Sequence, residues 1–143
     1  MDMYWIIALL LVFIVSIPSL VVLVYYSWRN GISPMPTSAL VRHEVSKQVQ
    51  IAVERMTGLH QQEQRFEQYT PHVVEAGSGW GTLAFQIATD CPAIRMIGIE
   101  NSPIPLGYSK LLARLQRSKI TFQQGDLYRY AYAEADVVVC YLF

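Results

Sequence analysis

Hydrophobic and polar positions follow two different patterns along this chain. Between Met3 and Trp28 no charged residue occurs, and aromatic residues cluster at both ends of this apolar run. A helix of that length rises about 37 Å, which exceeds the roughly 30 Å hydrocarbon core of a bilayer. Aromatic side chains at the ends are typical of residues that lie at the membrane–water interfaces. The pattern predicts a transmembrane anchor over residues 1–28.

The alternative interpretation of this run is a cleaved signal peptide. Such a peptide begins with a basic segment and has an apolar core of about 7–15 residues. Here the run is longer and is preceded only by Asp2 as a charged residue, which favours a retained anchor. Arg29 and Arg42 follow the run, so the positive-inside rule places the rest of the chain in the cytoplasm. We therefore expect a single-pass protein held in the lipid bilayer.

Residues 29–70 are expected to form a linker and a helical region. Proline, glycine and small polar residues dominate residues 30–38 and indicate the linker. Thr37 or Ser38 can cap a helix, and Gly58 is expected to end it. The apolar stripe that predicts this helix, which would cover a sheet or close a pocket, comprises Val41, Val45, Val49, Ala52 and Met56.

Beyond residue 70, short apolar runs alternate with amphipathic segments. Four runs predict strands, which begin near Val73, Ile97, Ile120 and Ala135. Near-continuous apolar runs suit parallel strands that are covered on both faces, so Cys140 in the last run is expected to be a core residue. The alternation predicts an α/β fold with a partial Rossmann-like sheet of four parallel strands over residues 71–143.

A further helix is expected to begin at the prolines that follow the second strand. Its leucines, which we expect to pack on the sheet, are Leu106, Leu111, Leu112 and Leu115. Its basic residues are Lys110, Arg114, Arg117 and Lys119. We interpret them as a solvated face, with contact to anionic lipid headgroups as the alternative. Stacking aromatics beside a basic groove are lacking, so no nucleic-acid partner is expected.

The composition adds little chemistry of its own. The chain has 143 residues with 11 basic and 11 acidic side chains, and the length suggests one domain. Its two cysteines and three histidines are scattered, so no metal site is predicted. No Ser/His/Asp constellation stands out, and no catalytic residue can be named.

A glycine-rich turn directly follows the first predicted strand. Gly77, Gly79 and Gly81 alternate there. Glycines permit positive φ and remove the Cβ atoms that would block a ligand, and the next helix offers free N–H groups at its start. Glu100, at the end of the second strand, can accept hydrogen bonds from ribose hydroxyls. The sequence therefore predicts a site for an adenosine-containing cofactor.

The glycine spacing indicates which cofactor the site would hold. Dinucleotide turns usually read G-x-G-x-x-G, whereas this turn reads G-x-G-x-G after the acidic Glu75. A carboxylate at that position suits the ammonium group of S-adenosylmethionine. The third predicted strand ends in Gly125-Asp126-Leu127. With these motifs, residues 71–143 resemble the class I S-adenosylmethionine-dependent methyltransferases, whose first motif is often E/D-x-G-x-G-x-G.

This resemblance implies S-adenosylmethionine as the cofactor and assigns roles to single residues. Asp126 would contact the adenine amino group, and the backbone next to it, at Leu127, a ring nitrogen. The cofactor-binding residues expected together are Glu75, Gly77, Ser78, Gly79, Gly81, Glu100, Asn101, Asp126 and Leu127. Such sheets normally continue after the fourth strand, so we expect a truncated chain with little transfer activity of its own.

The order of anchor, Pro36-Thr37 linker, helix and cofactor motifs resembles a narrower group, the small membrane-anchored lysine methyltransferases. That resemblance implies a lysine of a membrane protein as the methyl acceptor. Trp80 departs from the group, because many relatives carry a small acidic residue there. Two other functions remain open. One is an NAD-dependent oxidoreductase, which the glycine spacing disfavours, and the other is a non-catalytic, membrane-anchored binding module.

Overall fold

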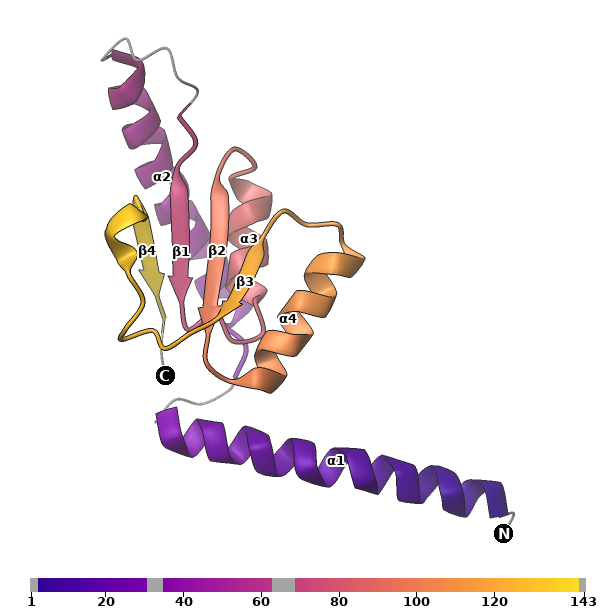
Figure 1. Cartoon of the computed structure of the whole chain (residues 1–143). Coiled ribbons are helices and arrows are strands. Elements are labelled where there is room, and N and C mark those ends of the chain that lie inside the picture. Colours follow the sequence, from indigo (N-terminus) through magenta and orange to yellow (C-terminus); the bar gives the residue numbers. More distant parts are fainter. Residues whose placement is uncertain (1–2, 31–34, 63–68, 142–143) are drawn as a thin grey trace.

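The structure is a computed structural model that describes residues 3–30, 35–62 and 69–141. Helix α1, Met3–Asn30, lies beyond the carboxyl ends of the strands of an α/β domain (Figure 1). The most apolar 18-residue stretch of Met3–Arg29 has a mean hydropathy of 3.1, and none of that stretch is buried in the protein. By length and composition this helix can cross a membrane, although an N-terminal signal sequence has the same properties.

Four parallel strands form one sheet, as the sequence predicts. They are β1 (His72–Ala76), β2 (Arg95–Glu100), β3 (Thr121–Gln124) and β4 (Val137–Cys140). Their order in the sheet is β3-β2-β1-β4, so the chain moves outward from β1 to β3 and then returns to the other side of β1. In open α/β sheets, ligands bind at the carboxyl ends of the strands where the order reverses in this way. Here that position lies next to the ends of β1 and β4.

The helices lie mainly on one face of this sheet. They are α2 (Ala39–Gln62), α3 (Thr82–Asp90) and α4 (Pro103–Leu115), and a short 3₁₀ helix, η1 (Tyr132–Glu134), precedes β4. The larger core cluster joins Val49 of α2 and Leu83 of α3 to Val73 of β1. Val74 points to the opposite face, where a smaller cluster forms. Because successive side chains along a strand point to opposite faces, β1 contributes residues to both clusters.

The helix after the linker confirms one expectation and corrects another. Its apolar stripe is buried or half-buried, with Val49 only 4% exposed, and the helix packs against α3 and β4. It does not end at Gly58 but continues to Gln62. A Cβ added at Gly58 would meet no atom within 4 Å, so neither a tight turn nor a close contact requires glycine there. An isolated glycine inside a helix costs about 1 kcal/mol, which neighbouring turns can offset.

Two expectations about burial are wrong. Leu111 and Leu115 do not pack on the sheet, because the period of α4 buries Leu106 and Ala113 and turns these two leucines outward. Cys140 is exposed, whereas Cys91 is buried. On β4 only Val139 is buried among the four strand residues, because its side chain faces the larger cluster. The apolar character of the run therefore did not mean that the strand is covered on both faces.

Candidate cofactor site

The glycine turn lies between β1 and α3 at the carboxyl end of the sheet. Gly77, Gly79 and Gly81 have φ values of 76°, 51° and 76°, in the left-handed region that disfavours side chains. The backbone N–H groups of Gly77 and Ser78 both donate to the carbonyl oxygen of Ile99 at 2.9 Å. The turn is thereby fixed over the end of the neighbouring strand β2.

Glu100 at the end of β2 has a structural role that the sequence did not predict. Its Oε2 accepts a hydrogen bond from the backbone N–H of Gly79 at 2.7 Å, and its Oε1 accepts one from Ser102 at 2.7 Å. The carboxylate therefore joins the glycine turn to the start of α4. Each carboxylate oxygen can accept a second hydrogen bond. The geometry thus leaves acceptor capacity for a ribose hydroxyl at this position.

Glu75, two residues before the first glycine, is almost fully buried at 4% exposure. Its Oε2 has no hydrogen-bond partner within the described part of the chain. Burial raises the pKa of Glu75 to about 8; a hydrogen bond from the backbone of Ala84 opposes this shift, and the charge of Glu100 adds to it. An unpartnered buried carboxylate is costly unless a ligand satisfies it. The ammonium end of S-adenosylmethionine would supply the hydrogen-bond donor that this acceptor oxygen lacks.

A pocket brings most of the predicted residues together at the carboxyl ends of β1 and β2. The predicted residues that line it are Glu75, Gly77, Ser78, Gly79, Glu100, Asn101 and Leu127. The hydroxyl of Ser78 is buried there without a hydrogen-bond partner among the described residues. Tyr141, which follows β4, lines the pocket and also packs against the larger core cluster. The pocket thus lies where the strand order reverses.

Gly81 has a packing role that the sequence did not predict. It is not among the residues that line the pocket. A Cβ at Gly81 would lie 2.7 Å from Cζ of Phe122, and one at Gly98 would lie 2.6 Å from Cδ1 of the same ring. These two glycines therefore make room for Phe122 of β3, which packs between β2 and the start of α3.

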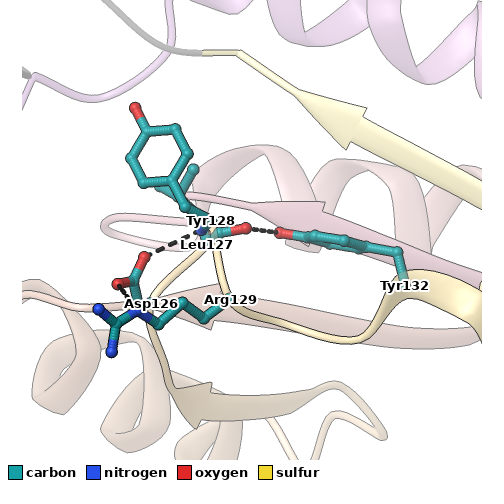
Figure 2. A network of polar contacts seen from close by, with 5 residues as sticks. All are labelled: Asp126, Leu127, Tyr128, Arg129 and Tyr132. Carbon is teal, nitrogen blue, oxygen red and sulfur yellow. Dashed lines mark hydrogen bonds and ion pairs between the residues drawn. The ribbon is translucent and has the colours of Figure 1, made fainter.

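Asp126 likewise lies outside the pocket lining. Its Oδ1 accepts a hydrogen bond from the backbone N–H of Tyr128 at 2.9 Å, and its Oδ2 lies 3.7 Å from Nε of Arg129 (Figure 2). The hydroxyl of Tyr132 donates to the carbonyl oxygen of Leu127 at 2.7 Å. These contacts hold the loop after β3 and direct Leu127, rather than Asp126, to the pocket.

The contribution of the apolar N-terminal helix to the site is not indicated by any pattern in the sequence. Four residues near the C-terminal end of α1 line the pocket: Val22, Leu23, Tyr26 and Ser27. Trp80, from the glycine turn, lines it as well. Hydropathy identifies such a helix but carries no information about which domain surface it contacts. The contact between α1 and the pocket can therefore be seen only in the three-dimensional structure.

Comparison with known proteins agrees with this geometry. Residues 73–143 match a family described as a methyltransferase domain. No curated protein matches the chain. The structure of an RNA methyltransferase from Salinibacter ruber in complex with S-adenosyl-L-homocysteine is similar, with 22% identity and a TM-score of 0.58 over 76% of this chain and 61% of that one. At this identity the likeness shows the fold alone.

Two further structures are more distant. A putative caffeoyl-CoA O-methyltransferase from Staphylococcus aureus has 14% identity and a TM-score of 0.49, over 83% of this chain and 49% of that one. A plantazolicin methyltransferase in complex with S-adenosylhomocysteine has 15% identity and a TM-score of 0.48, over 84% and 39%. The chain thus spans between about two fifths and three fifths of the length of these structures. Residues 73–143 form a class I S-adenosylmethionine-dependent methyltransferase domain.

Proposed function

We propose that the chain is a membrane-anchored methyltransferase whose α1 crosses the bilayer and whose α/β domain lies in the cytoplasm. The uncharged run and the arginine that follows it support the anchor and its orientation. The observation that carries the cofactor-binding part is Glu75, a buried acidic residue with an unpartnered Oε2, which is among the residues that line the glycine-rich pocket. A cationic amino group beside Glu75 would favour the charged form of the side chain and would offset the burial that raises its pKa.

Each of these pocket residues would contact a different part of the cofactor. Glu75 would hold the ammonium group, Gly77 and Gly79 would lie along the methionine part, and Glu100 would accept the ribose hydroxyls. Leu127 would border the adenine. When bound, S-adenosylmethionine supplies an electrophilic methyl group on its sulfonium. The chain itself contributes binding, orientation and the exclusion of water.

The methyl acceptor we propose is a lysine amine of a membrane protein. The order of anchor, linker and cofactor motifs supports this choice. The position of Tyr26 and Ser27 in the pocket lining supports it further, because these residues lie near the end of the proposed span. An acceptor at the membrane surface would reach such a pocket without leaving the bilayer.

Two experiments test the proposal. In the first, S-adenosylmethionine is titrated calorimetrically into the purified full chain and into Glu75→Gln, with Glu134→Gln as the matched control. Glu134 is exposed on η1 and lies outside the pocket lining. We expect binding in the parent chain and in the control, and a loss of at least about tenfold in Glu75→Gln. Equal affinity in all three would contradict the assigned site.

The second experiment tests catalysis and topology. The chain is incubated with radiolabelled methyl donor and membrane extract, and labelled proteins are analysed for methyllysine. Methyllysine that appears with the parent chain and not with Gly79→Val would support the proposed acceptor, and labelling without methyllysine would contradict it. A reporter fused after Phe143 should be active only in the cytoplasm. Activity on the other side of the membrane would refute the proposed orientation.

A further inference from the structure

The outer face of α4 presents apolar side chains to solvent. Tyr108, Leu111 and Leu115 are 49%, 56% and 72% exposed. Their spacing of three and four residues places them on one stripe of the helix. The side of α4 that packs on the domain consists of Pro105, Leu106, Ser109 and Ala113. The stripe therefore points away from the core, where its apolar surface stays in contact with water.

Basic side chains flank this stripe. Residues 101–125 contain four of the 11 basic residues of the chain and none of its 11 acidic residues. Lys110, Arg114 and Arg117 are exposed, and no ion pair within the described part of the chain involves them. The same three side chains line a groove between α4 and β3. Leucine and tyrosine beside lysine and arginine are typical of helices that lie in a bilayer interface.

The position of α4 brings this face close to the proposed anchor. α4 contacts α1. Ile104 at the start of α4 and Leu23 of α1 line the same pocket. Figure 1 shows α4 on the side of the domain toward which α1 extends. If α1 crosses the bilayer, this contact holds α4 near the membrane surface.

We propose that the outer face of α4, defined by Tyr108, Leu111, Leu115, Lys110 and Arg114, docks on an anionic bilayer surface. This inference rests on the proposed anchor. The leucines would enter the boundary between headgroups and acyl chains, and the cations would contact anionic headgroups. The ring of Tyr108 packs edge-on against Trp80 of the cofactor pocket, with centroids 5.4 Å apart. Docking would therefore fix the pocket at the membrane surface.

The test uses the full chain reconstituted in vesicles, with Cys140→Ser to remove the exposed thiol. A nitroxide spin label is attached at Leu111→Cys, and a matched control carries it at Glu134→Cys. Glu134 is exposed on η1, away from α4. The vesicles contain phosphatidylcholine alone or with phosphatidylserine. We expect the label at 111 to become oxygen-accessible and shielded from a water-soluble relaxation agent in anionic vesicles, while the label at 134 stays in water.

Charge reversal tests the electrostatic part. Each cation near an anionic surface contributes about fivefold to the ratio of docked to undocked chains. Lys110→Glu with Arg114→Glu should therefore lower that ratio at least about 25-fold. Lys47→Glu with Arg55→Glu is the control, because both residues are exposed on α2. Equal effects of the two pairs, or shielding that is the same on neutral vesicles, would overturn the proposal.

A separate readout distinguishes failure of the anchor from failure of docking. Resistance of the vesicle-bound chain to extraction at alkaline pH reports on α1 alone. Release by this treatment would refute the anchor, whereas a resistant chain with a water-exposed label at 111 would refute docking only.

Discussion

The carboxylate of Glu100 accepts a hydrogen bond from the backbone N–H of Gly79 at 2.7 Å. This bond joins the end of β2 to the middle of the glycine turn that follows β1. Because the acceptor is buried and charged, the bond is stronger than one between neutral groups. Glu100 thus shapes the turn in addition to any contact with a ribose.

This relationship predicts two linked effects of Glu100→Ala. The affinity for S-adenosylmethionine should fall roughly tenfold to hundredfold, since hydrogen bonds to a charged group contribute about 1.5–3 kcal/mol. The free energy of unfolding should fall as well, because the N–H groups of Gly79 and Ser102 lose their acceptor. Calorimetry and thermal unfolding in detergent measure the two effects. Unchanged stability with weakened binding would show that the carboxylate serves the ligand alone.

Glu75 predicts a pH dependence of stability. Its pKa in the folded chain is about 8, against a usual value of 4.5, so the folded state holds this proton more tightly than the unfolded state does. Below pH 4.5 the group is neutral in both states. Between pH 4.5 and 8 the unfolded chain releases the proton first, so this group lowers the free energy of unfolding as the pH rises.

The variant Glu75→Gln should remove that part of the pH dependence. The amide has no proton to release, and it has nearly the shape of the neutral carboxyl group. Denaturation at several pH values between 5 and 8 measures the slope in both proteins, and Glu134→Gln should keep the slope of the parent chain. Parallel curves for Glu75→Gln and the parent would contradict the raised pKa.

The sequence predicted the sheet well because the relevant signals are local. The apolar runs predicted the four parallel strands, and the alternating glycines predicted the turn, where all three glycines have positive φ. The positions of Gly81 and Leu111 depend instead on contacts between elements distant in sequence. The ring of Phe122 leaves no room for a Cβ at Gly81, and the rotation of α4 about its axis turns Leu111 outward. A pattern read along the chain contains neither relationship.

Gly79 and Gly81 should respond differently to substitution. A Cβ at Gly79 would meet no atom within 4 Å, so Gly79→Val should retain the packing of the domain apart from the strain of φ 51°. That strain costs about 1–2 kcal/mol. Because Gly79 lines the pocket, the added side chain should abolish cofactor binding while the chain stays in the membrane fraction. Calorimetry and membrane extraction measure the two outcomes, and retained affinity would contradict the assigned position of the ligand.

Gly81→Ala should instead destabilise the domain. The new Cβ would lie 2.7 Å from the ring of Phe122, at a residue with φ 76°. Overpacking of this kind costs about 1–3 kcal/mol, and the left-handed conformation costs about 1–2 kcal/mol more. Phe122→Leu relieves the clash, so it should destabilise the Gly81→Ala chain less than it destabilises the parent. A double-mutant cycle of unfolding free energies measures this coupling. Additive effects would show that Phe122 is not what requires glycine at position 81.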